Sequence, residues 1–291
     1  MGTLYLVSTP IGNLEDLTLR ARRILAEADT VLAEDTRRTG ILLRHLELKR
    51  PLLSLHQHNE EARVREVLDA LDQGRELALV SDAGTPLLSD PGERLVKRVL
   101  EAEHTVVPIP GPSAILAALV ASGLPTLPFV FLGFAPRKGK ERTRLLERVA
   151  ASAETVVLFE SPERAEVLLA DLVRACGGDR PAAVARELTK VHEEFRRGTL
   201  GELARYYGEE APRGEVTLVV GPAGEDAAGE EVDREAARAL GRALLEQGTS
   251  PSRAAREVAR RLGIPRNQAY DLIQELASEP GASTDQDPRH P

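Results

Sequence analysis

The feature that most constrains this chain is a regular alternation, over its first 220 residues, of short apolar runs with amphipathic stretches. Some runs, such as Leu77-Ala78-Leu79-Val80, are apolar at every position instead of alternating with polar residues. Strands that are buried on both faces have this composition, and parallel sheets are built from them. The pattern predicts an α/β protein with doubly wound, mainly parallel sheets.

The apolar runs predict nine strands and divide into two groups at a proline-rich hinge, 122–128. We expect one α/β domain over 1–117 and a second over 118–222. A small, acidic break at 221–231 precedes three expected helices that form a C-terminal helical domain, 233–278, and we expect the polar tail 279–291 to be disordered. The expected strands are 3–8, 30–34, 52–55, 76–81, 105–109, 128–134, 155–159, 182–186 and 215–220.

Composition narrows the class of protein. No apolar stretch approaches the roughly 20 residues that span a bilayer, and the start of the chain lacks a secretory signal, so we expect a cytoplasmic protein without a membrane anchor. A single cysteine, Cys176, excludes an internal disulfide. The net charge of −8 argues weakly against a polyanionic partner, although a local basic cluster can outweigh it.

Polar residues gather where the expected strands end. Because ligands bind at the carboxyl ends of strands in open parallel sheets, these turns predict a ligand cleft between the two α/β domains. The turns begin at Ser8, Glu34, His56, Ser81 and Pro110 in the first half, and at Phe159 and Arg186 in the second.

The motifs exclude several ligands. The chain has no glycine-rich dinucleotide fingerprint, no P-loop and no hydrolase elbow. His56 and His58 have no third ligand nearby in sequence, so we expect no metal. The turn Asp82-Ala83-Gly84-Thr85-Pro86 offers backbone N–H groups and a carboxylate, which suit a zwitterionic or ribose-bearing ligand.

Seven segments of the chain, in order, resemble the tetrapyrrole-methylase-like, class III S-adenosylmethionine-dependent methyltransferases. The resemblance runs from about residue 3 to 221, and it is closest to members that act on small-subunit ribosomal RNA. It implies S-adenosylmethionine bound between two α/β domains, 2′-O-methylation of a cytidine in the decoding region of 16S ribosomal RNA, and a homodimer. The segments begin at Thr9, Ala33, Val80, Ser89, Pro110, Ser122 and Arg186.

The same resemblance assigns residues to the cofactor. Phe159 stands where similar sequences often carry tyrosine, which removes one hydroxyl from the site. The expected cofactor contacts are Pro10, Ser81, Asp82, Ala83, Gly84, Thr85, Ser113, Ala114, Phe159, Leu188, Val216 and Thr217.

A ribose hydroxyl is a weak nucleophile at neutral pH, so a positioned base should assist its attack on the methyl group. The candidates are Lys190, Glu187, Glu160 and, less favoured, His56. Lys190 would need a lowered pKa to act as a base, and it could instead hold a phosphate. Glu187 could equally be a structural partner of Arg186.

The densest basic run follows the strand expected at 128–134. It contains Arg137, Lys138, Lys140, Arg142 and Arg144, and six basic residues between 137 and 148 face only two acids. A solvated helix start would have this composition, but a phosphate track for RNA is the preferred interpretation.

Two alternatives stay open. One is a C-methyltransferase of a tetrapyrrole such as a precorrin, with the same fold and cofactor. The other is a DNA-binding regulator with an α/β sensor, because 252–276 has the spacing of a helix-turn-helix. We favour an accessory domain that aids dimerisation or RNA docking.

Overall fold

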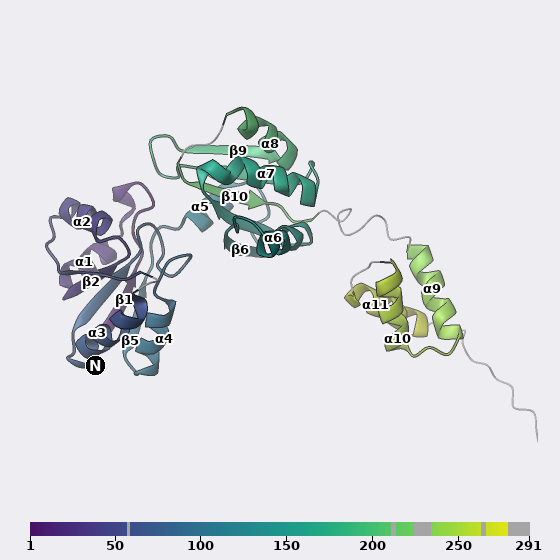
Figure 1. The fold of residues 1–291 in the computed structure, drawn as a ribbon, viewed down its shortest axis with the longest axis horizontal. Coiled ribbons are helices and arrows are strands. Elements are labelled where there is room, and N and C mark those ends of the chain that lie inside the picture. Colours follow the sequence, from purple (N-terminus) through teal and green to yellow (C-terminus); the bar gives the residue numbers. More distant parts are fainter. Residues whose placement is uncertain (57–58, 211–213, 224–233, 263–265, 279–291) are drawn as a thin grey trace, which may run out of the picture. The chain divides into compact units, whose positions relative to one another are not determined.

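The computed structural model describes residues 1–56, 59–210, 214–223, 234–262 and 266–278 (Figure 1). The chain divides into two compact units, Met1–Ala223 and Gly224–Pro291. The first unit holds two five-stranded sheets and the second holds three helices. A division of the first unit into domains at residue 118 stays a prediction. The tail expected to be disordered and His58 lie outside the described residues.

The first sheet is parallel throughout, in the order β3-β2-β4-β1-β5. Two helices pack on one face and two on the other, because each contributes an apolar stripe to one of two separate core clusters. This is the doubly wound arrangement that the sequence predicts. The strands are β1 (Thr3–Val7), β2 (Thr30–Ala33), β3 (Leu52–Ser54), β4 (Glu76–Val80) and β5 (Thr105–Ile109); α1 (Leu19–Glu27) and α2 (Thr36–His45) cover one face, and α3 (Glu60–Asp72) and α4 (Glu93–Glu101) cover the other.

The second sheet has the order β6-β7-β10-β8-β9 and is mixed. Here the expectation of mainly parallel pairing needs correction, because only β6 and β7 pair in parallel. The connection between β8 and β9 is too short for a parallel crossover, so β9 reverses direction. A helix then links β9 to β10, which runs in the direction of β9. The strands are β6 (Phe129–Phe134), β7 (Thr155–Glu160), β8 (Pro181–Arg186), β9 (Glu194–Thr199) and β10 (Val216–Val220).

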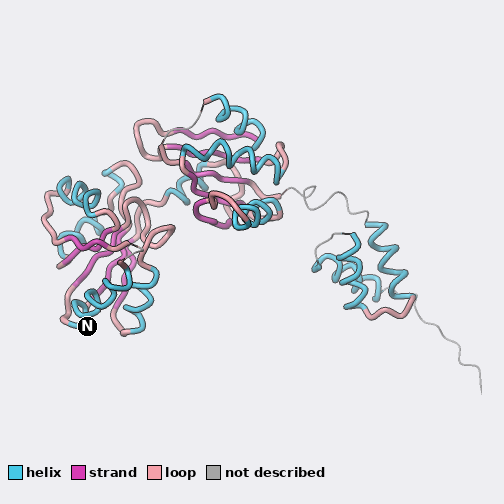
Figure 2. The backbone as a smooth tube through the Cα atoms, in the orientation of Figure 1, coloured by secondary structure: helices cyan, strands magenta, loops and turns pink. Residues whose placement is uncertain are grey.

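Helices cover both faces of the second sheet as well (Figure 2). On one face pack α6 (Lys140–Ala150), α7 (Pro162–Cys176) and α8 (Leu200–Glu209). The other face is covered by α5 (Ala114–Ala121), which follows the last strand of the first sheet. Ile11, from the loop after β1, joins the same apolar cluster, so the two halves of the first unit share a core.

No apolar run marks β9 in the sequence. Its residues, Glu-Phe-Arg-Arg-Gly-Thr, are half-buried and carry three charges, and the strand lies at the edge of the sheet. Charged side chains protect edge strands from pairing with other chains. Arg196 of this strand lies 3.4 Å from the ring centroid of Tyr206 in α8, so its charge also contributes to packing.

The second unit contains α9 (Arg234–Glu246), α10 (Pro251–Leu262) and α11 (Arg266–Ser278) around one apolar cluster. The sequence predicts these helices over 233–247, 251–262 and 266–277, and the observed bounds agree to within one residue. Among the helices that the structure describes, none is long and apolar enough to cross a membrane.

We predict that Arg180→Ala destabilises the first unit. The Arg180 side chain, with the residue 5% exposed, donates hydrogen bonds to the carbonyl oxygens of Val149, Ala150, Ser152 and Gly221. Removing it takes one hydrogen-bond donor from each of these carbonyl groups, so the free energy of unfolding should fall by about 2–4 kcal/mol. Chemical denaturation measures the loss. Arg205→Ala, at an exposed position on α8, is the control, and an equal effect of both substitutions would contradict the assignment.

Candidate functional site

A cleft of about 400 Å³ lies where the rims of the two sheets meet. Its volume is within the range of about 300–1,000 Å³ that is usual for small-molecule sites. The start of β10 reaches the same rim as the end of β7, because the strands are antiparallel and Thr217 pairs with Phe159. The lining residues are Ile11, Glu34, Arg38, Asp82, Ala83, Gly84, Thr85, Leu88, Ser89, Asp90, Ser113, Ala114, Ile115, Phe134, Phe159, Glu160, Ser161, Pro162, Glu215, Val216 and Thr217.

Most residues expected at the cofactor are brought together here. Nine of the twelve line the cleft: Asp82, Ala83, Gly84, Thr85, Ser113, Ala114, Phe159, Val216 and Thr217. The other three, Pro10, Ser81 and Leu188, do not. Ser81 donates a hydrogen bond to the carbonyl of Gly84 at 3.0 Å and so stabilises the loop that lines the cleft. Leu188 is part of the shared apolar cluster beneath the cleft.

The loop between β4 and α4 is held in an unusual conformation. Leu87 and Ser89 both have a positive φ, 76° and 71°, which side chains other than glycine rarely adopt. Thr9 and Gly84 exchange backbone hydrogen bonds of 2.9 and 3.0 Å, which join this loop to the loop that follows β1. Backbone strain of this kind persists only where the surroundings impose it, and it is frequent at functional sites.

Three carboxylates lie along one wall of the cleft, on Glu34, Asp82 and Asp90. Asp82 accepts a hydrogen bond from the backbone N–H of Asp35 at 3.0 Å, and Arg38 lies 3.6 Å from it. Burial and then the charges of Glu34 and Asp82 raise the pKa of Asp90 to about 6. Burial, followed by the charge of Asp82, also raises the pKa of Glu34.

Glu34 and Asp90 line the cleft but were not among the cofactor-binding or catalytic residues expected from the sequence. Glu34 had a usable signal, because it ends the strand expected at 30–34 and begins one of the polar turns predicted to form the cleft. Asp90 lies ten residues beyond β4, and only the folding of that loop returns it to the rim.

Glu160 ends β7 and lines the cleft although it is only 2% exposed. One carboxylate oxygen, Oε1, accepts a hydrogen bond from the Ser161 N–H at 2.8 Å and pairs with Arg164. The other oxygen, Oε2, is buried and has no hydrogen-bond partner among the described residues. Burial raises the pKa of Glu160 against the opposing effect of these partners.

Lys190 and Glu187 form an ion pair of 2.9 Å and are not among the residues that line the cleft. Burial disfavours the charge on Lys190, but the carboxylates of Glu187 and Glu215 outweigh it and raise its pKa. Burial likewise opposes the charge on Glu187, yet the hydrogen bond from Lys190 leaves its pKa lowered. Both groups are therefore charged at neutral pH, and Lys190 is poorly suited to act as a base. His56 does not line the cleft either.

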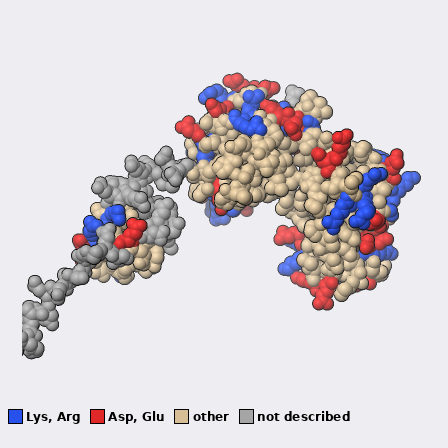
Figure 3. All heavy atoms as spheres, turned by 180° about the vertical axis from the view of Figure 1, so that it is seen from behind, with Lys and Arg blue, Asp and Glu red and all other residues tan. Residues whose placement is uncertain are grey.

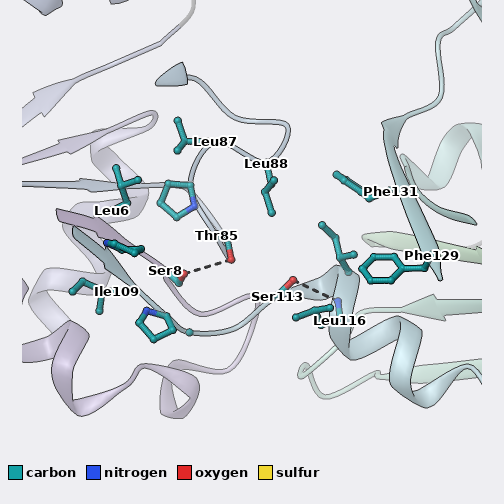
Figure 4. A pocket seen from close by; sticks show the side chains of 15 residues that line it. Leu6, Ser8, Thr85, Leu87, Leu88, Ile109, Ser113, Leu116, Phe129 and Phe131 are labelled. Atoms are coloured by element: carbon teal, nitrogen blue, oxygen red, sulfur yellow. Dashed lines mark hydrogen bonds between the residues drawn. The ribbon is translucent and has the colours of Figure 1, made fainter. Parts of the chain in front are cut away.

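A larger cavity of about 760 Å³ lies beside the cleft (Figure 4). Its walls are almost wholly apolar, with Leu6, Ile109, Phe129 and Phe131 among the residues that point toward it. The hydroxyl of Ser8 already donates to that of Thr85 at 3.4 Å. Ligand sites need a few convergent polar groups, so the smaller cleft is the better candidate. Within the described part of the chain, no three His, Cys, Asp or Glu side chains are grouped to hold a metal.

Comparisons with known proteins agree with this geometry. Residues 3–204, more than half of the chain, match the family described as Tetrapyrrole (Corrin/Porphyrin) Methylases. A ribosomal RNA small subunit methyltransferase I from Synechocystis sp. is 46% identical over 280 residues, which are 96% of this chain and all of the relative. The chain belongs to the ribosomal RNA small subunit methyltransferase I family. It is therefore a methyltransferase.

Other relatives agree with this membership. The protein of the same name from Micromonospora olivasterospora is 48% identical, covering 96% of this chain and 88% of the relative. Uroporphyrin-III-C-methyltransferase from Thermus thermophilus shares the fold, with a TM-score of 0.55 at 25% identity, over 76% of this chain and 94% of that one. Residues 230–277 match the RsmI C-terminal HTH domain, so the three last helices are a part of the family's own architecture. The helix-turn-helix spacing of 252–276 therefore no longer favours a DNA-binding regulator.

The basic run lies at the start of α6. Arg137, Lys138, Lys140 and Arg144 are exposed, as a phosphate track requires. Arg142 is buried and corrects the expectation, since its guanidinium donates to Asp171 at 2.7 Å and to the Pro136 carbonyl at 2.9 Å. It fixes α6 to α7 and is unavailable to RNA.

We predict that Asp90→Asn stabilises the protein increasingly as the pH rises from 4 to 7. A carboxyl whose pKa is raised by folding stabilises the protein fully at a pH below its unfolded-state pKa. This stabilisation is lost as the pH rises through the pKa of the folded state. The neutral amide removes this loss, which amounts to about 1–2 kcal/mol after allowance for solvent screening. Thermal unfolding at several pH values measures it, with the exposed Asp69→Asn as control. A stability difference that is independent of pH would refute the prediction.

Proposed function

We propose that this chain transfers a methyl group from S-adenosylmethionine to the 2′-hydroxyl of a cytidine in the decoding region of 16S ribosomal RNA. The observation that carries the proposal is the carboxylate-lined cleft at which loops from both sheets converge, in a member of a ribosomal RNA methyltransferase family. The relatives from Synechocystis sp. and Micromonospora olivasterospora, which are 46% and 48% identical, are named as ribosomal RNA methyltransferases, whereas the tetrapyrrole enzyme from Thermus thermophilus is 25% identical. These identities favour ribosomal RNA over a tetrapyrrole as the substrate.

The residues of the cleft suit S-adenosylmethionine. That molecule supplies a methyl group on a positively charged sulfonium and also carries an ammonium group. The carboxylates of Glu34, Asp82 and Asp90 would offset these positive charges. Leu88 and Ile115 offer apolar surface for its rings, and the turn that contains Gly84 allows close approach of the backbone.

Among the candidate bases, Glu160 has the properties that proton abstraction requires. It lines the cleft, one oxygen is unpartnered among the described residues, and its pKa is raised toward the working pH. Arg164 and the Ser161 N–H hold its other oxygen and so orient the carboxylate. Glu160 would accept the proton of the ribose hydroxyl while that oxygen is held about 3 Å from the methyl carbon. Lys190 would remain a positive charge near the rim.

The RNA would be held by the exposed residues of the basic run. On the face shown in Figure 3, basic and acidic side chains are interspersed over both halves of the first unit, so a local track is a better explanation of RNA binding than a general positive field. The protein would act in the cytoplasm, on the RNA of the small ribosomal subunit.

We also propose that the chain is a homodimer. Helix α5 is apolar on all sides, and its outer residues Leu116 and Val120 are 53% and 71% exposed. A second copy of the chain would cover this apolar surface. Light scattering of the purified protein tests this assignment through its molar mass.

The decisive experiment incubates the protein with S-adenosylmethionine labelled in its methyl group and with small ribosomal subunits that lack the modification. Label on a cytidine ribose supports the proposal, and mapping of the labelled nucleotide locates the target. Label in an added precorrin, or no transfer at all, overturns it. Calorimetric titration separately measures binding of S-adenosylmethionine.

We predict that Glu160→Gln lowers the single-turnover rate by about 100- to 10,000-fold, because an amide cannot accept the proton. Binding of S-adenosylmethionine should change little. Since the base acts only when deprotonated and its pKa is raised, the wild-type rate should fall on acidification at a higher pH than for an ordinary glutamate. Glu163→Gln, at an exposed position on α7, is the matched control. An undiminished rate in the Glu160 variant would exclude this base.

We predict that the double substitution Arg137→Glu and Lys138→Glu weakens RNA binding and flattens its salt dependence. Each lost phosphate contact should reduce the slope of log affinity against log salt by about 0.7–0.9. Fluorescence anisotropy with labelled ribosomal RNA measures both quantities. The exposed Arg205→Glu serves as control, and a slope equal to that of the wild type would remove the basic run from the RNA site.

A further inference from the structure

A β-bulge in β6 sets the direction of an aromatic side chain. The pairing of β6 with β7 runs in register from Phe129 to Phe131, and then shifts so that Phe134 lies opposite Phe159. Gly133 lies within this irregular stretch with a φ of 68°, a conformation that suits glycine. A bulge inserts an extra residue and re-aims the side chains that follow it.

The side chain that follows the bulge, Phe134, lines the cleft and is nevertheless 53% exposed. Its ring centroid lies 5.4 Å from that of Phe159, whose ring in turn packs edge-on against Phe131 at 4.9 Å. The chain has only five phenylalanines and no tryptophan, so three of its few large aromatic rings meet at this one rim. Phe159, which is itself backed by Phe131, packs against Phe134 and leaves much of the Phe134 surface open.

We propose that Phe134 is the stacking platform for the nucleobase of the target nucleotide. The inference rests on the proposed function and names the contact that positions its substrate. A base whose ribose enters an enclosed cleft must leave its own stack, and proteins replace the lost stacking with an aromatic side chain. The geometry supplies such a ring at the mouth of the cleft.

The position of Phe134 favours the RNA base over the adenine of the cofactor. Arg137 and Lys138 follow only three and four residues later, and both are exposed. A base held on Phe134 would therefore have its flanking phosphates beside positive side chains. The backbone turns that suit the cofactor belong to other walls of the cleft, at 82–85 and 113–114.

Three substitutions at one position test the proposal: Phe134→Ala, Phe134→Leu and Phe134→Trp. Alanine should weaken binding of unmodified small subunits about 5- to 100-fold, which corresponds to the usual loss of one stacked base. Tryptophan should retain binding, and leucine, which has similar bulk without a π face, should not. The Kd for S-adenosylmethionine, measured by calorimetry, should stay within about twofold in all three. Leu100→Ala, at an exposed position on α4, is the control.

The outcomes separate this inference from the function on which it rests. If the wild type neither binds nor methylates small subunits, the proposed function fails and this inference fails with it. If the wild type is active and Phe134→Leu binds subunits as tightly, the ring offers only apolar contact and stacking is refuted. If S-adenosylmethionine binding weakens while subunit binding does not, the ring serves the cofactor. Thermal unfolding of each variant verifies that it is folded.

Discussion

The close approach of two loops, one from each sheet, determines the shape of the site. Gly12 leaves no room for a side chain, because a Cβ atom there would lie 2.5 Å from Cγ of Lys190 and 3.0 Å from the carbonyl oxygen of Leu188. The N–H of Asn13 donates to the hydroxyl of Thr189 at 3.0 Å in the same place. Beneath this contact, Ile11 and Leu188 share one apolar cluster with α5. These interactions bring the loop-bearing rims together, and the cleft exists because they meet.

The placement of charge follows from this geometry. Carboxylates gather inside the cleft, whereas the basic run lies on the exposed segment after β6. Under the proposed function, a cationic methyl donor and an anionic polymer would each meet a surface of opposite sign within one acidic protein. The half-buried ion pairs near the rim, such as that of Lys190 with Glu187, hold the loops in place. A group that is already paired and fully charged has little capacity to move a proton at neutral pH.

Much of the fold could be predicted because burial leaves a direct mark on sequence. The largely apolar runs located β1, β4 and β10, and strand-end motifs located Asp82 and Ser113. Strand direction in the second sheet could not be predicted. An apolar run does not indicate whether its strand pairs in parallel or antiparallel, and β9 is too charged to be recognised as a strand. Arg142 illustrates the same limit for sites: its neighbours in the basic run are exposed, and only the helix periodicity of α6 and its ion pair with Asp171 bury it.

The position of Phe134 has a practical consequence for optical spectroscopy. Because the chain contains no tryptophan, its four tyrosines dominate its ultraviolet emission, over the weak emission of its phenylalanines. An indole introduced at the mouth of the cleft would be the sole fluorophore of its kind in the molecule. Its emission maximum and its quenching would then report on the polarity and occupancy of that one location, without interference from the rest of the chain.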